Sequence, residues 1–409
     1  MFRKMIISSI VAISILLSSA AMPVFAAPNP DEYNAVTVTK ILERTDVFQL
    51  KAKGSILMDG NSGSVLLESN SHERLPIASV TKVMSMLLIM EAIDAGKIRF
   101  EDTVPITPYV MSFGGSQLWL DVRESNKYTV AEILKAIAVH SANDATVAMA
   151  EMIAGSEKAF VDMMNQRAKE LGLNDTNYLD CTGLTDIDHY SSAYDIAIAS
   201  RELITKHPKI FDFTTIRHDK FGEGKRAKPT DLDNTNKLIG RYDGINGLKT
   251  GFTNKAGFNL SATAKRNNVQ LIAVVLGEPD SNTRFAEIQR LLDYGFTNFE
   301  SAQVNKKGEE ASIIEVKKGL QTSVKAVYPE NISFLIKKGD KNKIVRDLRV
   351  EASLTAPIEA GQKVGHIVYM IDGKEVGKAD LVAEMKVERA SFVKLFTRMM
   401  KHWFGIGRI

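Results

Sequence analysis

A serine and a lysine stand three positions apart where a loop gives way to an apolar helix. The residues LPIASVTK (75–82) precede the run VMSMLLIMEAIDAG, which ends near Gly96. Residues three apart share one helix face, so the Ser79 hydroxyl and the Lys82 amine can meet. A serine hydroxyl needs a base before it becomes a good nucleophile, and an uncharged amine is one such base. The alternative is that Ser79 caps the helix and Lys82 is a solvated surface residue.

Two other short motifs could complete a site around this pair. The motif S-A-N (141–143) falls between two predicted helices within residues 128–155, and K-T-G (249–251) lies in a predicted strand. Taken alone, the first could be a helix cap and the second a strand end. Because all three motifs occur in order on a helix start, an interhelical loop and a strand, they favour one shared catalytic site.

Several other chemistries have no basis in this sequence. There is no G-x-S-x-G, H-E-x-x-H, Walker or C-x-x-C motif, and the seven histidines show no ligand-like pairing. We therefore expect neither a metal nor a cofactor. His140, next to S-A-N, is expected to be a packing or surface residue. The net charge of +3 is too small to indicate a nucleic-acid partner.

The pattern of apolar residues predicts the elements that must position these motifs. Residues 54–70 read as a hairpin, residues 160–172 as an amphipathic helix, and the segment from 243 onward as a meander of strands closed by a helix near 297. The sequence thus predicts a helical cluster inserted between the strands of one antiparallel sheet.

The ends of the chain differ in composition from this region. Residues 1–26 have a basic start, an apolar run and small residues before Ala26, as in a secretory signal peptide with cleavage there. An uncleaved signal anchor is the alternative, and both readings place the body of the protein outside the cytoplasm. Residues 27–45 read as a polar leader. Cys181 is the only cysteine, so no intrachain disulfide can form.

The remaining domain boundaries follow from further changes in the pattern of apolar and charged residues. Residues 46–298 are predicted to form the domain that carries the motifs. Residues 299–385 contain short alternating runs that predict a small, sandwich-like all-β domain with a hairpin at 371–373. Residues 386–409 are predicted to form a terminal amphipathic helix.

The terminal helix has one bulky apolar face and one basic face. Its apolar stripe is Phe392, Leu395, Phe396, Met399, Met400, Trp403 and Phe404, and Lys394, Arg398 and Lys401 lie opposite. The segment carries too many charges to span a bilayer, and its two faces suit an anionic membrane surface. The alternative is a helix docked on the protein's own core.

With these motifs, the sequence resembles the penicillin-recognising serine enzymes, and within them the low-molecular-mass D-alanyl-D-alanine carboxypeptidases. The stretches SANDA, DGINGLKTGFTNKAG and LGLNDTNYLDCTGL extend the resemblance across residues 46–297. The resemblance implies an α/β (α+β) domain of the β-lactamase/transpeptidase type, an antiparallel sheet with helices on both faces and an inserted helical cluster. It also implies an exported bacterial enzyme, peripheral on the outer face of the cell membrane.

The resemblance assigns roles to the first two motifs. Ser79 is the nucleophile that attacks between the terminal D-alanines of a peptidoglycan stem peptide, and Lys82 is its base. Ser141 relays the proton to the leaving D-alanine, while Asn143 bonds the substrate amide and holds Lys82. The backbone N–H groups of Ser79 and Phe252 stabilise the oxyanion.

The third motif is expected to bind substrate. Lys249 and Thr250 hold the terminal carboxylate, and Gly247 and Gly251 leave room for a peptide along the strand edge. For Lys82 to act as a base, its pKa must be lowered by burial and by the nearby cation of Lys249, so we expect it to be largely buried.

Three rival functions share this scaffold. A β-lactamase of the same fold would use a glutamate to activate the deacylating water, and Glu170 stands in an E-x-x-L-N pattern (170–174). We expect Glu170 to be a surface residue instead. A transpeptidase would differ only in its acceptor, and a non-catalytic binding module would need a broken motif. β-Lactam antibiotics are expected as covalent inhibitors.

Overall fold

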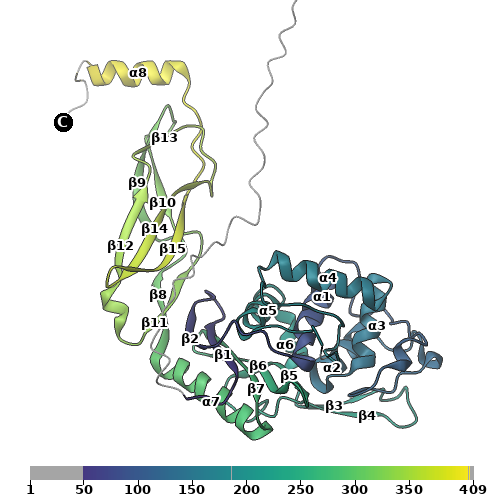
Figure 1. Ribbon diagram of the computed structural model, residues 1–409. Coiled ribbons are helices and arrows are strands. Elements are labelled where there is room, and N and C mark those ends of the chain that lie inside the picture. Colours follow the sequence, from purple (N-terminus) through teal and green to yellow (C-terminus); the bar gives the residue numbers. More distant parts are fainter. Residues whose placement is uncertain (1–48, 186, 404, 406–409) are drawn as a thin grey trace, which may run out of the picture. The chain divides into compact units, whose positions relative to one another are not determined.

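The computed structural model describes residues 49–185, 187–403 and 405. The predicted signal peptide and leader lie outside the described residues, and so does Phe404 of the terminal stripe. The first part of the described chain is built on a five-stranded antiparallel sheet of order β2-β1-β7-β6-β5 (Figure 1). Its strands are β1 (Gly54–Asp59), β2 (Val65–Ser69), β5 (Ile245–Thr253), β6 (Gly257–Arg266) and β7 (Val269–Glu278).

Both faces of this sheet are buried, as alternate side chains of β7 show. Ile272 and Val274 belong to a core shared with the helical cluster. Leu271 and Ala273 belong to a second core formed with α7 (Ser281–Asn298), whose Ile288 is fully buried. Successive residues of a strand point to opposite faces, so helices cover both sides. The predicted fold class is confirmed.

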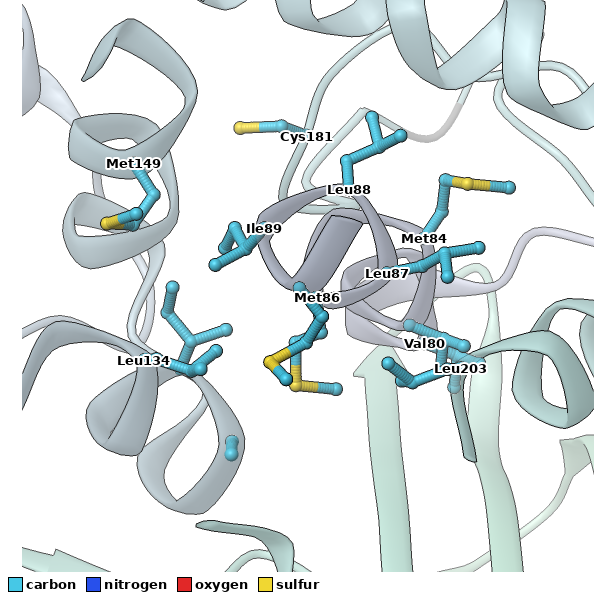
Figure 2. Packing of buried hydrophobic residues seen from close by; sticks show 14 of the residues in the cluster. Val80, Met84, Met86, Leu87, Leu88, Ile89, Leu134, Met149, Cys181 and Leu203 are labelled. Carbon is cyan, nitrogen blue, oxygen red and sulfur yellow. The ribbon is translucent and has the colours of Figure 1, made fainter. Parts of the chain in front are cut away.

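The helical cluster lies in the chain between β2 and β5, as predicted. It comprises η3 (Ala78–Thr81), α1 (Lys82–Asp94), η4 (Val110–Ser112), η5 (Val122–Glu124), α2 (Val130–His140), α3 (Asn143–Ala154), α4 (Glu157–Glu170), α5 (Ala193–Lys206), η6 (Pro208–Ile210) and α6 (Phe211–Thr214). Helix α1 is buried on nearly all sides. Figure 2 shows it surrounded by Leu134 of α2, Met149 of α3, Leu203 of α5 and the loop residue Cys181.

Several elements of this region were not predicted, among them α5, α6 and a hairpin. Strands β3 (His218–Phe221) and β4 (Thr230–Asp233) form a short hairpin of mostly polar residues. Only Phe221 and Leu232 are buried in it, so the sequence lacks a strand-like apolar pattern. Arg226, in the connecting turn, lies over the Phe221 ring.

Residues from 299 onward form sheets with their own core. A six-stranded sheet has the order β12-β14-β15-β10-β9-β13, and β8 pairs separately with β11. The bounds are β8 (Phe299–Asn305), β9 (Glu310–Lys317), β10 (Ser323–Val327), β11 (Ile332–Lys337), η7 (Asp340–Lys343), β12 (Val345–Val350), β13 (Ser353–Thr355), β14 (Lys363–Ile371) and β15 (Lys374–Ala383). The turn between β14 and β15 is the hairpin predicted at 371–373.

The last described helix, α8 (Phe392–Trp403), has no buried residue. Phe392 is 81% exposed and Met399 is 55% exposed, so the apolar face is not docked on a core. On the opposite face, Arg398 donates hydrogen bonds to the carbonyl oxygens of Gly319 and Leu320 at 3.0 and 2.8 Å. Within the described part of the chain, no helix has the length and hydropathy to cross a bilayer.

Candidate active site

The Ser79 hydroxyl and the Lys82 amine meet at the entry to α1. Ser79 lies in the 3-10 turn η3 and Lys82 is the first residue of α1, which places Lys82 Nζ 3.0 Å from Ser79 Oγ. Lys82 is completely buried, as the sequence analysis predicted, and Ser79 is partly buried. The alternative of a solvated surface lysine is therefore wrong.

The partners of the Lys82 amine suit its uncharged form. Besides Ser79, Nζ contacts Asn143 Oδ1 at 2.6 Å and the carbonyl oxygen of Thr182 at 2.7 Å. Both of these oxygens can only accept hydrogen bonds, whereas a hydroxyl can also donate one. A neutral amine has two N–H groups and one lone pair. When its two N–H groups bond Asn143 and Thr182, the lone pair faces the Ser79 hydroxyl.

Burial lowers the pKa of Lys82 to about 8, against the partly opposing charges of Asp180 and Asp144. The expected contribution of Lys249 is not seen, because burial is the cause that lowers this pKa. The pKa of Lys249 is lowered by burial first, and then by the charges of Lys82 and Arg284. Burial is therefore the cause that allows Lys82 to lose its charge near neutral pH.

Contacts from distant segments fix the turn that carries Ser79. Asn259 Nδ2 of β6 donates to the carbonyl of Pro76 at 3.2 Å. Ala78 has φ +48°, a left-handed conformation that is rare for a residue with a side chain and must be held by its surroundings. Gly183 provides part of that support, because a Cβ atom there would stand 1.9 Å from the Ala78 carbonyl oxygen.

The S-A-N motif joins α2 to α3 and delivers Asn143 to the lysine. Ser141 ends α2 in the left-handed region with φ +65° and is buried. Asn143 binds Lys82 through Oδ1 and donates from Nδ2 to the Gly114 carbonyl at 2.7 Å. The Ser141 hydroxyl makes no hydrogen bond with Ser79 or Lys82 among the described residues. The structure thus brings Asn143 to the reacting pair, while the role of Ser141 stays a prediction.

The K-T-G motif lies on β5, the edge strand of the sheet, and packs against η3. Lys249 is buried, and its Nζ donates to the Thr250 carbonyl at 2.9 Å. A Cβ atom on Gly251 would stand 2.5 Å from the Ile77 carbonyl oxygen and 3.1 Å from the Ser79 nitrogen. This close approach brings the peptide group that follows Gly251 beside the nucleophile. The side chain of Phe252 is half exposed.

The two glycines of this strand pack closely against other parts of the protein. A Cβ atom on Gly247 would meet Thr263 Oγ1 at 3.0 Å and Thr214 Oγ1 at 3.4 Å. The space beside Gly247 is thus occupied by the protein, and the space beside Gly251 by the backbone of η3. Both glycines allow close internal packing in the direction that a side chain would take, and room for a peptide along the edge of β5 stays a prediction.

The sequence analysis missed two contributors to the site. The carbonyl of Thr182 is a backbone group, which no residue type reveals, although its DCTGL loop was singled out. Thr235 accepts a hydrogen bond from Thr250 Oγ1 at 2.7 Å, and its own N–H bonds the Val139 carbonyl. Because Thr235 lies outside every motif, only the fold brings it to the K-T-G strand.

Glu170 is remote from this site, as expected. Its side chain is 48% exposed and pairs with Arg167, which also binds Glu91 at 2.7 Å. Glu91 lies nine residues after Lys82 on α1, about 13 Å along the helix axis. The carboxylate of Glu170 therefore has no access to an ester on Ser79.

Comparisons with known proteins agree with this geometry. The family described as D-alanyl-D-alanine carboxypeptidase matches residues 39–280, and the C-terminal domain of penicillin-binding protein 5 matches residues 299–389. The chain is 42% identical over 362 residues to D-alanyl-D-alanine carboxypeptidase DacF of Bacillus subtilis, covering 88% of this chain and 92% of that protein.

Two comparisons from Haemophilus influenzae extend this result. D-Alanyl-D-alanine carboxypeptidase DacA of that organism is 34% identical, over 90% of this chain and 91% of its own. The crystal structure of its penicillin-binding protein 5 superimposes with a TM-score of 0.73 at 34% identity, covering 84% of this chain and 99% of that one. The chain belongs to the D-alanyl-D-alanine carboxypeptidase family of serine-type hydrolases.

Proposed function

We propose that this chain removes the terminal D-alanine from peptidoglycan stem peptides through an acyl-enzyme on Ser79. One observation carries the proposal: the buried Lys82 amine has two carbonyl acceptors for its N–H groups and directs its third position at Ser79 Oγ. With a pKa near 8, the amine is uncharged in an appreciable fraction of molecules at neutral pH.

In acylation, Lys82 Nζ takes the proton of the Ser79 hydroxyl while Oγ attacks the carbonyl carbon of the penultimate D-alanine. The carbonyl oxygen becomes an oxyanion between the N–H groups of Ser79 and Phe252. The bond from carbon to the leaving nitrogen then breaks. Ser141 relays the proton held by Lys82 to that nitrogen, which leaves Lys82 uncharged again, and Asn143 bonds the substrate amide while keeping Lys82 in place.

In deacylation, water attacks the ester carbon and gives its proton to Lys82. The bond from the carbonyl carbon to Ser79 Oγ then breaks, Lys82 returns that proton to Oγ, and the shortened peptide leaves. A β-lactam that acylates Ser79 is expected to remain bound much longer, because Glu170, the residue that a β-lactamase mechanism would use, lies far from the ester. This argument favours the carboxypeptidase over the β-lactamase reading.

Substrate specificity would come from the edge strand β5. Lys249 and Thr250 would bind the terminal carboxylate, and the hydrogen bond from Thr250 Oγ1 to Thr235 would support that role. Burial lowers the pKa of Lys249 in the unliganded site. An arriving carboxylate favours the charged form of that amine, so binding and charging of Lys249 are coupled.

The rest of the chain would deliver this domain to its substrate. We propose a signal peptide at 1–26, a leader at 27–45, a catalytic domain at 46–298, a β-domain at 299–385 and a membrane-surface helix at 386–409. The exposed apolar face of α8 supports peripheral binding to an anionic membrane. On this proposal the enzyme works on the outer face of a bacterial cell membrane, with neither metal nor nucleic acid.

Labelling with a fluorescent penicillin tests the function most simply. The full chain should become covalently labelled, and Ser79→Ala should remain unlabelled. Release of D-alanine from a peptide ending in D-Ala-D-Ala should be lost in the same variant. Retained labelling of Ser79→Ala would remove the proposed nucleophile, and rapid turnover of the penicillin adduct would indicate a β-lactamase.

A further inference from the structure

The loop of residues 180–185 contacts the catalytic turn at several successive points. Its Thr182 carbonyl binds Lys82, and its Cys181 carbonyl accepts from Ser85 Oγ at 2.6 Å. Its Gly183 lies against Ala78. These contacts involve the loop backbone, so the position of the lysine amine depends on what fixes that backbone.

The carboxylate of Asp180 organises the loop from within. Oδ1 accepts hydrogen bonds from the backbone N–H groups of Thr182 at 2.7 Å and Gly183 at 2.5 Å, and from Thr182 Oγ1 at 2.7 Å. Oδ2 accepts from the N–H of Thr185 at 2.8 Å. One buried carboxylate thus turns these N–H groups inward. The peptide carbonyl of Thr182 is left directed at Lys82.

His189 connects the same region to η3 from the other side. Its Nε2 lies 2.8 Å from Thr81 Oγ1, whose single hydroxyl hydrogen is already donated to the Ala78 carbonyl at 2.8 Å. The hydroxyl must therefore accept from His189, so Nε2 carries the hydrogen. Nδ1 then accepts from the Leu179 N–H at 3.2 Å. This tautomer satisfies all three bonds.

We propose that Asp180 and His189 are positioning residues for acylation, holding the Thr182 carbonyl and the turn 78–81 in register with the Lys82 amine. The proposal rests on the proposed roles of Ser79 and Lys82. It adds that Asp180, Thr182 and His189 set the geometry of the base together with Asn143. A small displacement of the amine would slow acylation without removing any reacting group.

A pair of substitutions at His189 separates positioning from simple stabilisation. His189→Phe removes the Nε2 donor, whereas His189→Gln keeps an N–H near the same place. We expect His189→Phe to lower the second-order rate constant of penicillin labelling by about tenfold to hundredfold, with His189→Gln within about threefold of wild type. The final labelled fraction of folded protein should be unchanged. His218→Phe, at a largely exposed histidine, is the matched control.

The same comparison can be made from the partner side if His189→Phe does not fold. Thr81→Val removes the acceptor hydroxyl at nearly constant volume, and Thr81→Ser retains it. Thr81→Val should be labelled by penicillin slowly, and Thr81→Ser should be labelled at close to the wild-type rate. Asp180→Asn, which keeps one oxygen for the loop amides, should give an intermediate rate.

Three outcomes decide the question. Labelling of wild type but not of Ser79→Ala shows that the proposed nucleophile holds, whatever the variants do. If His189→Phe and Thr81→Val then label at the wild-type rate per folded molecule, the positioning role is wrong. It is equally wrong if His189→Gln is as slow as His189→Phe, because the N–H donor would then not be the feature that matters.

Discussion

Gly251 faces Ser79 so closely that a Cβ atom on Gly251 would stand 3.1 Å from the Ser79 backbone nitrogen. The nucleophile and the K-T-G strand are therefore packed backbone to backbone, with no side chain between them. In the proposed mechanism this packing places the N–H groups of Ser79 and Phe252 around one oxyanion.

Replacing Gly251 by alanine should disturb that arrangement. The added methyl would also meet the Ile77 carbonyl, so β5 and η3 must move apart. We expect Gly251→Ala to lower the penicillin acylation rate by about tenfold or more, since oxyanion donors act over short distances. Gly247→Ala is the matched control, because its methyl meets only threonine side chains away from Ser79. Similar acylation rates for the two variants would argue against this account.

The charge next to the lysine should set the pH dependence of acylation. Asn143→Asp places a carboxylate against Lys82 Nζ, which favours the ammonium form and raises the pKa of Lys82 above about 8. Less neutral amine is then available at pH 7, so the acylation rate should begin to rise only at a higher pH. Asp144→Asn removes a charge that raises the same pKa, so in that variant the acylation rate should rise at a lower pH. If both variants shift the pH profile of acylation in the same direction, Lys82 is not the group that sets this profile.

Glu170 offers a test of the β-lactamase alternative. Its side chain pairs with Arg167 on the surface of α4. We therefore expect Glu170→Gln to release the penicilloyl group at the wild-type rate, within about twofold, as surface substitutions are normally mild. The measurement is loss of fluorescent label from pre-acylated enzyme. A tenfold slower release would place Glu170 in the deacylation step.

The terminal helix should bind anionic vesicles. Wild-type protein is expected to sediment with vesicles of phosphatidylglycerol and phosphatidylcholine, and not with phosphatidylcholine alone. Phe392→Glu with Phe396→Glu should abolish sedimentation at any salt concentration. Lys394→Glu with Lys401→Glu should weaken it mainly at low salt, by roughly fivefold for each removed positive charge. Sedimentation that none of these substitutions changes would show that α8 is not the membrane contact.

The sequence predicted those parts of the fold that depend on residue patterns. The apolar stripe of α2, the Asn/Gly turns of the β5–β7 meander and the Asp372-Gly373 hairpin each specify a local structure, and each is present. The β3–β4 hairpin was missed because it is held by a few tertiary contacts and carries little pattern of its own.

The candidate site divides in the same way. Ser79, Lys82 and Asn143 were identified by residue type and spacing, and the structure brings their side chains together. The Thr182 carbonyl, the tautomer of His189 and the contact of Thr235 with Thr250 depend on backbone groups and long-range packing. Residue identity does not encode those features, so sequence reasoning could not reach them.

The central claim is that a buried, uncharged Lys82 amine activates Ser79, and the pH dependence of acylation tests it most directly. The second-order rate constant for penicillin labelling of the full chain should rise with pH, with a midpoint near 8. Ser79→Ala should show no labelling at any pH. A rate that does not change between pH 6 and 9, or a midpoint at the ordinary lysine value of 10.5, would contradict the account.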